Sequence, residues 1–431
     1  MDLQVIIAVS VFTIAYLFII SEKIHRTIIA LAGAMLMICL GILTQEMAIH
    51  HIDFNTLGLL IGMMIIVGVT SQTGFFNYLA IFAAKKVKAD PVKLLVVLSL
   101  LTAVCSAFLD NVTTVLLTVP ITISIARKLK LNPMPYLISQ ILTSNVGGTA
   151  TLIGDPPNIM IGSAVRELTF MAFIDNLAFI SCVILIVTVA ILVLIYRKNL
   201  TTTDELREEV MAINEKDELK DMPLLKKCLG VLAITIILFF LHQVLHLESA
   251  TVAVFGASLL LVVAHKEIEN GLGIEGVFEK VEWAALFFFV GLFVMVGGLI
   301  ETGVISFLAQ KAIEITAGEP VLTSMMILWL SAIASAFIDN IPFVATMIPL
   351  IKDMGMMGVA NLEPLWWSLA LGACLGGNGT LIGASANIIV AGLAAKDGHP
   401  ISFIEFLKIG FPLMILSIIM SSVYIYFRYL M

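Results

Sequence analysis

The sequence predicts an all-α polytopic membrane protein of about ten crossings. It is built from two inverted repeats, each with a re-entrant helical hairpin and a broken transmembrane helix. Of the 431 residues, 60% are hydrophobic and 13% are charged, whereas soluble domains have about 25% charged residues. Apolar runs close to membrane-spanning length recur along the chain. Two motifs recur at one constant offset, and basic residues flank only one copy.

The internal repeat is visible in two motifs. SAFLDNVTTVLLTVP, which begins at Ser106, returns as SAFIDNIPFVATMIP at Ser335 (335 − 106 = 229). TLIGDPPNI, which begins at Thr151, returns as TLIGASANI at Thr380 with the same offset (380 − 151 = 229). Two motifs with one offset indicate an internal duplication, in which each copy forms the same structural unit.

The N-terminal spans occupy residues 1–52. The positive-inside rule places the loop with Lys23 and Arg26 on the cytoplasmic side, because cytoplasmic loops carry the excess of basic residues. The next loop contains His50 and His51, which we interpret as solvated residues, with a pH or metal role as the alternative.

The first repeat spans residues 53–196, and its hairpin is expected near 94–126. Each arm of about 16 residues is too short for a comfortable crossing, which needs about 20. The stretch therefore predicts a re-entrant hairpin with Asp110 and Asn111 at its tip, buried in protein or facing a water-filled cavity. Both of its ends should be cytoplasmic, because seven basic residues flank it: Lys85, Lys86, Lys88, Lys93, Arg127, Lys128 and Lys130.

A broken helix near residues 135–164 follows this hairpin. Its middle, NVGGTATLIGDPPN, contains several glycines and two adjacent prolines. Proline removes a backbone donor and glycine weakens a helix, so we expect an unwound segment from about Asn145 to Pro157. The polar stretch 197–227 should then form a cytoplasmic linker.

The second half repeats this plan in the opposite orientation. Two connecting spans occupy residues 228–281, and the second repeat occupies 282–431, with its hairpin near 321–350 and its broken helix near 365–393. An odd number of crossings separates the starts of the two copies, which inverts the second. None of the basic positions around the first hairpin is basic at the offset of 229, as expected if the second hairpin opens to the outside.

Acidic and amide residues inside these apolar elements form the candidate site for an ion or substrate. Ionisable groups inside a membrane are costly and mark functional sites; here they are Asp110, Asp155 and Asp339. The alternative is a structural hydrogen bond at the tip for Asp110 and Asp339, and a helix N-cap for Asp155. Neutral oxygens expected to line the same site come from Asn111, Asn145, Thr149, Asn158, Asn340, Asn378, Thr380, Ser385 and Asn387.

The residue types of this site favour a cation. The repeat mate of Asp155 is Ala384, so we expect the first-copy side of the site to be the more acidic. The hairpin tips and broken-helix centres contain no Lys or Arg, and several carboxylates oppose an anionic substrate. A buried carboxylate can exchange a proton near neutral pH, and a cation can displace that proton. We expect H⁺ or Na⁺ as the coupling ion and no other cofactor, with Na⁺ held by Asp110, Asn111, Asp339 and Asn340.

SAFLDNVTTVLLTVP together with NVGGTATLIGDPPNI closely resembles the P protein (pink-eyed dilution type) group of the ion transporter superfamily. That superfamily includes arsenite/antimonite permeases, sodium/proton antiporters, citrate–metal symporters and divalent-anion/sodium symporters. The resemblance covers nearly the whole chain and implies two inverted repeats in a homodimer. Dicarboxylate symporters carry Ser-Asn-Thr at the hairpin tips, where this chain has Asp110-Asn111-Val112 and Asp339-Asn340-Ile341.

These features predict a secondary active transporter of a small inorganic ion in the plasma or inner membrane. It would work by alternating access and be coupled to H⁺ or Na⁺, since inverted repeats with broken helices are typical of this class. Cation/proton exchange is favoured over arsenite/antimonite efflux, because a thiolate site needs clustered cysteines, and over citrate or dicarboxylate symport.

Two other classes remain open. A passive channel shares the broken helices, but it does not accumulate an ion against a gradient. An intramembrane aspartyl protease also needs two buried Asp residues, but its Gly-x-Gly-Asp signature is missing, so we expect no enzyme. The net charge of −7 is spread over loops and indicates no nucleic-acid partner. The expected partners are the lipid bilayer, the small ion and a second copy of the chain.

Overall fold

All regular secondary structure of the described chain is helical. The structure is a computed structural model and describes residues 3–21 and 23–431. Within these ranges, eight helices are long and apolar enough to cross a membrane: Leu3–Ser21, Phe54–Gln72, Pro91–Phe108, Phe170–Tyr196, Met222–Leu241, Trp283–Glu301, Pro320–Phe337 and Phe403–Leu430. The prediction of an all-α polytopic membrane protein is confirmed.

Two antiparallel helix pairs pack in the same way, one on each repeat. The pair α1 (Leu3–Ser21) and α2 (Arg26–Cys39) packs on α17 (Trp283–Glu301). The pair α13 (Met222–Leu241) and α14 (Ser249–Val263) packs on α4 (Phe54–Gln72). Because α4 and α17 are themselves related by the offset of 229, each repeat is covered by an equivalent pair.

The offset seen in the sequence also holds for the hairpin helices. The first arms are α6 (Pro91–Phe108) and α19 (Pro320–Phe337), which begin and end 229 residues apart. Each starts with a proline behind an acidic N-cap, a favoured helix start because proline needs no backbone partner there. Asp90 accepts from the amide of Lys93 at 2.9 Å, and Glu319 accepts from that of Leu322 at 2.6 Å.

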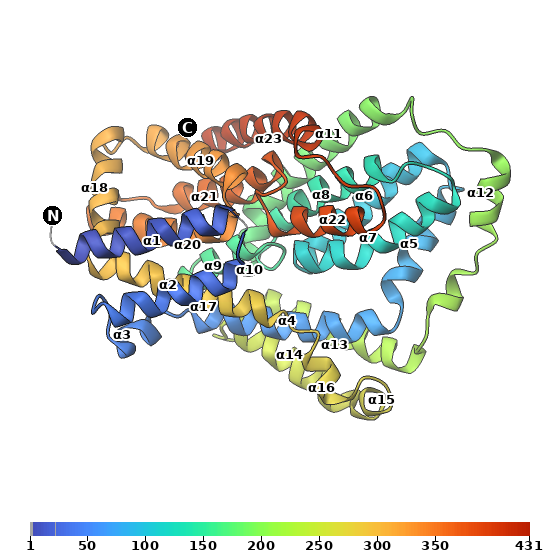
Figure 1. Cartoon of the computed structure of the whole chain (residues 1–431), viewed down its shortest axis with the longest axis horizontal. Coiled ribbons are helices and arrows are strands. Elements are labelled where there is room, and N and C mark those ends of the chain that lie inside the picture. The colour runs from blue at the N-terminus through green and yellow to red at the C-terminus, as the bar shows by residue number, and fades with distance from the viewer. Residues whose placement is uncertain (1–2, 22) are drawn as a thin grey trace.

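The two hairpins enter the molecule from opposite ends. The second arms are α7 (Asn111–Lys128) and α20 (Asn340–Met356), so each hairpin turns at its Asp-Asn pair. In Figure 1 the first hairpin opens toward the right end, where α5 (Phe75–Lys86) and α12 (Asp204–Met211) lie. The second opens toward the left end, where α18 (Val304–Thr316) lies. The predicted inverted repeats and re-entrant hairpins are confirmed.

Each repeat also contains a broken helix. The first consists of α8 (Met134–Thr149) and α9 (Pro156–Ala164). The second consists of α21 (Glu363–Gly376), a short 3₁₀ turn (Gly377–Gly379) and α22 (Ser385–Lys396).

The unwound segment of the first broken helix, residues 150–155, is shorter than the segment predicted from its glycines. Gly147 is still helical, within α8. A Cβ at this position would lie 2.2 Å from the backbone oxygen of Ala103 on α6. Its mate Gly376 stands in the same relation to Ala332, at 2.6 Å. These glycines therefore permit close packing of two helices rather than unwinding one.

The polar linker crosses the mouth of the first hairpin. It follows α11 (Phe179–Tyr196) and contains α12 and a 3₁₀ turn, Glu215–Glu218. Lys85 at the end of α5 donates to Glu215 Oε2 at 2.5 Å and to the carbonyl of Ile213 at 2.8 Å. Thr202 Oγ1 donates to the carbonyl of Leu129, just past α7, at 2.8 Å.

The remaining elements are short or lie at the periphery. The histidine loop forms a short helix that ends at His50. His51 follows it, and its Nε2 lies 3.0 Å from Glu301 Oε1. The helices not yet given are α3 (Gln45–His50), α10 (Phe170–Phe173), the π-helix Ile174–Ala178, α15 (His265–Asn270), α16 (Gly273–Phe278), α23 (Phe403–Ile425) and the π-helix Tyr426–Leu430.

Candidate functional site

The first hairpin tip and the two broken helices meet in a buried network of amides. Asn145 on α8 lies at its centre and is fully buried. Its Oδ1 accepts from Asn111 Nδ2 at the first tip, at 3.0 Å. Its Nδ2 donates to Asn378 Oδ1 at 2.9 Å and to Asn387 Oδ1 at 3.0 Å, both in the second repeat. One side chain therefore connects the first tip to the second broken helix.

Asn158 and Asn387, which are one repeat apart, both donate hydrogen bonds to backbone carbonyls where the helices break. Asn387 Nδ2 donates to the carbonyls of Gly377 at 2.7 Å and Thr380 at 2.9 Å. Asn158 Nδ2 donates to the carbonyl of Thr151 at 2.9 Å. Carbonyls at a helix end lack intrahelical partners, and buried ones need a donor. The two amides supply it.

The same pair also joins the two repeats. Asn387 Oδ1 accepts from Asn145, and Asn158 Oδ1 accepts from Cys374 Sγ at 3.5 Å. Cys374 is the repeat mate of Asn145 (374 − 145 = 229). The site is therefore two-fold related in its contacts as well as in its helices.

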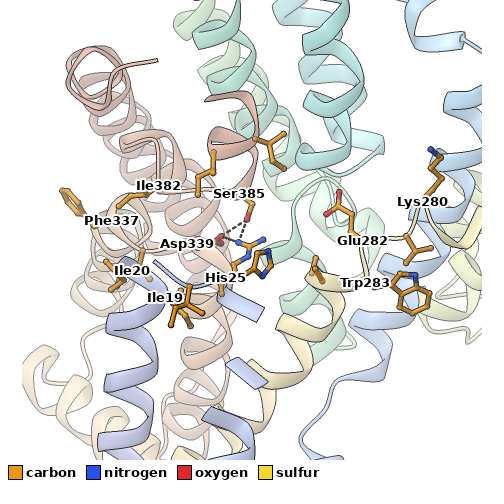
Figure 2. A pocket seen from close by; sticks show the side chains of 18 of the residues that line it. Ile19, Ile20, His25, Lys280, Glu282, Trp283, Phe337, Asp339, Ile382 and Ser385 are labelled. Carbon is orange, nitrogen blue, oxygen red and sulfur yellow. Dashed lines mark hydrogen bonds and ion pairs between the residues drawn. The ribbon is translucent and has the colours of Figure 1, made fainter. Parts of the chain in front are cut away.

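The second tip holds an ion pair that the sequence did not predict. Asp339 Oδ2 pairs with Arg26 Nη1 and accepts from Ser385 Oγ at 2.7 Å. Arg26 Nη1 also donates to Ser385 Oγ at 2.6 Å. Asp339 Oδ1 meanwhile caps α20 by accepting from the amide of Ile341 at 3.2 Å. Figure 2 shows Asp339 and Ser385 facing one another with these interactions drawn as dashed lines.

Arg26 corrects the reading of the N-terminal loop. We expected this arginine to be a cytoplasmic flanking charge, but it begins α2 at the level of the second hairpin tip. The missed signal is its position as the first residue of an apolar helix instead of one inside a loop. Its partners, 313 and 359 residues away, are not visible in any local pattern.

Asp155 stands at the N-cap position of α9, yet its side chain makes no capping hydrogen bond there. The residue is fully buried. Its Oδ1 accepts from Asn340 Nδ2 of the second tip at 3.4 Å, and its Oδ2 has no hydrogen-bond partner within the described chain. We expected the first-copy side to be the more acidic, but this carboxylate reaches across to the second tip.

Asp110 at the first tip makes local contacts. Its Oδ1 accepts from the amide of Thr113 at 2.8 Å, and its Oδ2 accepts from Thr113 Oγ1 at 2.5 Å. This is the geometry of an N-cap of α7. Residues 3–21 and 23–431 provide no ion pair for Asp110. The amide network includes Asn111 but not Asp110.

The remaining predicted residues hold backbone of the broken helices. Thr149 Oγ1 donates to the carbonyl of Asn145 within α8 at 2.7 Å. Thr380 Oγ1 donates to the carbonyl of Ala336 in the second hairpin. Asn378 Nδ2 donates to the carbonyl of Leu142 at 3.2 Å. These side chains fix the backbone around the site.

A cavity of about 700 Å³ lies beside the second tip. Isoleucines form much of its lining. Its polar lining residues are His25, Arg26, Glu279, Lys280, Glu282, Asp339 and Ser385. In Figure 2, Asp339, Ser385 and His25 lie in the middle of this lining, between Phe337 on one side and Lys280 and Trp283 on the other. The second tip is thus reached through an open space of ligand size.

The cysteines near the motifs do not lie together. Cys374 contacts Asn158, whereas Cys105 packs near Val67, Phe76 and Leu109. The part of the chain that the structure describes contains no group of three or more His, Cys, Asp or Glu residues placed to hold a metal ion.

The chain is similar to known transporters over nearly its whole length. A family model described as citrate transporter matches residues 16–372. An uncharacterised transporter of Mycobacterium tuberculosis is 41% identical over 98% of both chains. A 46 kDa membrane protein of Mycobacterium leprae is 39% identical over 99% of both. The P protein of Homo sapiens is 34% identical over 98% of this chain, which spans 60% of that protein.

A solved structure shares the fold. The crystal structure of the YdaH transporter of Alcanivorax borkumensis, described as having an unusual topology, matches with a TM-score of 0.58 at 14% identity. The match covers 98% of each chain. The predicted resemblance to the ion transporter superfamily and its P protein group is confirmed. The chain therefore belongs to the citrate transporter family and is a multi-pass transporter of the plasma membrane.

Proposed function

We propose that this protein is a secondary active transporter of a small inorganic ion, working by alternating access and coupled to H⁺ or Na⁺. Within this class the site favours cation/proton exchange. The observation that carries the proposal is Asp155, which is fully buried and has one carboxylate oxygen without a partner in the described chain. An isolated buried charge is costly, so this group gains stability when it binds either a proton or a cation.

The charge of the site supports a cation. Three acids, Asp110, Asp155 and Asp339, lie at or beside the hairpin tips, and one arginine is paired with the last of them. The formal charge is therefore negative when the acids are ionised. Carboxylate and amide oxygens are suitable ligands for Na⁺, and Asn111 Oδ1 also lacks a partner in the described residues.

Alternating access follows from the inverted hairpins. Both tips contact the first broken helix, at Asn145 and Asp155, while the hairpin mouths face opposite ends of the molecule (Figure 1). Movement of one hairpin relative to the amide network opens the site to one side, and movement of its mate opens it to the other. In a homodimer, which we propose by analogy with the superfamily, each copy contains a complete site.

Two anionic or neutral substrates are the alternatives. A citrate-type or dicarboxylate symport is favoured by the matched family model and by the guanidinium of Arg26 beside the cavity. Arsenite/antimonite efflux is the next alternative, but Cys105 and Cys374 lie in different clusters, which disfavours a thiolate site. A passive channel is the last.

The test is transport by the purified protein in liposomes with an imposed pH gradient. Uptake is measured for Na⁺, Li⁺, arsenite and citrate in parallel. We expect a pH gradient to drive accumulation of Na⁺ or Li⁺ above its equilibrium level. Gradient-driven citrate accumulation would favour the symporter instead, and equilibration without accumulation would favour a channel.

A further inference from the structure

In the described residues, the acid at the second hairpin tip is paired with an arginine, and the acid at the first tip is not. Arg26 Nη1 pairs with Asp339 and donates to Ser385 Oγ, which in turn donates to Asp339 Oδ2. In the first repeat, Ser249 stands in place of Arg26, because each begins the helix that packs on α4 or α17, and Gly62 meets Ala253 as Gly291 meets Ala30 (249 − 26 = 223; 253 − 30 = 223). Pro156 stands in place of Ser385 (385 − 156 = 229). The pairing is therefore an asymmetric addition to a two-fold fold.

The N-terminal helix pair holds this guanidinium in position. Tyr16 Oη on α1 donates to the carbonyl of Pro342 on the second hairpin at 2.7 Å. Thr27 Oγ1, next to Arg26 on α2, donates to the carbonyl of Ala284 on α17 at 2.7 Å. The Arg26 guanidinium lies 4.8 Å from the centre of the Phe288 ring, within cation–π distance. Helices α1, α2 and α17 thus fix the cation against the tip.

The ion pair competes directly with a free cation. Asp339 is 8% exposed and Arg26 is 26% exposed toward the cavity, so their mutual attraction is only partly screened. A tethered group acts at an effective concentration in the millimolar range or above. A free monovalent ion must displace the guanidinium from Asp339, whereas Asp110 and Asp155 have no ion pair in the described chain.

We propose that Arg26 is a tethered counter-ion that occupies, at Asp339, the place that a transported cation takes at a free carboxylate. Asp339 then exchanges no ion, and exchange is carried by Asp110 and Asp155. The inference rests on the proposed function only for this division of exchange between the acids. The charged groups around Asp339 are Arg26 and, through Asn340, Asp155. The adjoining cavity is also lined by Glu279, Lys280 and Glu282.

Three variants test the pairing: Arg26→Gln, Asp339→Asn and the double variant. Removing one partner of a buried ion pair leaves an unpaired charge and destabilises strongly, whereas replacing both by neutral groups is often close to neutral. We expect each single variant to lower the midpoint of thermal unfolding and the double variant to raise it back toward the wild type. Arg166→Gln is the matched control, because Arg166 forms only an exposed ion pair with Glu248.

The transport readout tests the exchange. We expect both single variants to lose pH-gradient-driven cation flux and the double variant to regain a measurable part of it. Asp110→Asn should lose this flux in either background. A folded double variant without any regained flux would show that Asp339 exchanges an ion itself and would overturn the proposal. A double variant whose thermal midpoint falls by the sum of the single effects would overturn it too.

If the neutral variants do not fold, a lysine variant at Arg26 tests the proposal instead. Arg26 makes both of its hydrogen bonds through Nη1 alone, so a single ammonium group can replace them. Arg26→Lys should therefore fold and retain more flux than Arg26→Gln; equal loss in both would overturn the proposal. If the wild type shows no coupled flux with any ion, the proposed function fails, and the thermal midpoints still decide the role of Arg26.

Discussion

Asp155→Asn distinguishes two roles of Asp155, that of an ion ligand and that of a structural residue, because they predict opposite effects on cation affinity and on stability. The carboxylate has one weak hydrogen bond, 3.4 Å long, and its other oxygen has no partner in the described chain. A contact to a charged ligand contributes about 1.5–3 kcal/mol, and a factor of ten in affinity corresponds to about 1.4 kcal/mol. We expect the apparent affinity for the coupling cation to fall about 10- to 100-fold.

The same substitution should leave the protein as stable as before or make it more stable. Asparagine is nearly isosteric, can keep the contact with Asn340 and removes an unpaired buried charge. The assay pairs cation-dependent flux in liposomes with thermal unfolding in detergent. Asp221→Asn is the matched control, because Asp221 caps α13 by accepting from the amide of Leu224 at 2.9 Å, and asparagine caps about as well. Unchanged affinity, or a clear drop in the thermal midpoint, would refute the ligand role.

Three other predictions concern topology, the tip acids and packing. In a cysteine-free background, cysteines at Lys88 and Lys130 should label only from the cytoplasm, and cysteines at Ala317 and Val359 only from outside; opposite-side labelling within a pair would end the re-entrant model. Asp110→Asn and Asp339→Asn should each fold, reach the membrane and lose pH-gradient-driven flux, the first because an exchanging carboxylate is lost and the second because Arg26 is left unpaired; retention in both would contradict both roles. Gly147→Ala should cost about 1–3 kcal/mol of stability, because its Cβ meets backbone in α6. Gly230→Ala, with open space around the Cβ, should instead gain up to about 1 kcal/mol in thermal unfolding.

The fold could be predicted because duplication repeats every local signal. Asp90-Pro91 and Glu319-Pro320 start equivalent helices, and the Asp-Asn pairs end the first arms of both hairpins. Span lengths follow from membrane thickness, and orientation follows from loop charge. These signals depend on neighbouring residues and on solvent, so they are present in the sequence itself.

The contacts within the site depend on tertiary packing and were not predictable in the same way. Gly147 has the same sequence signature whether it unwinds a helix or admits a neighbouring backbone. Arg26 looks like any basic residue at the end of a span until α1 and α2 dock on α17. Asp155 meets a tip in the other repeat, 185 residues away. The sequence identifies polar residues inside the membrane, but only the packed structure shows which of them pair.

The linker over the first hairpin makes the two hairpin mouths unequal, although the hairpins themselves are related by a two-fold repeat. Its contacts, from Lys85 to Glu215 and from Thr202 to the carbonyl of Leu129, lie at the mouth of the first hairpin. At the mouth of the second hairpin, Glu314 stands in place of Lys85 (314 − 85 = 229) and bonds within its own helix, to Gln310 at 3.1 Å and to Lys311 at 2.5 Å. Opening the first mouth must strain or break contacts to the linker that have no counterpart at the second mouth in the described part of the chain. Inward and outward half-cycles should therefore run at unequal rates, and Lys85→Ala should change the ratio of uptake to release.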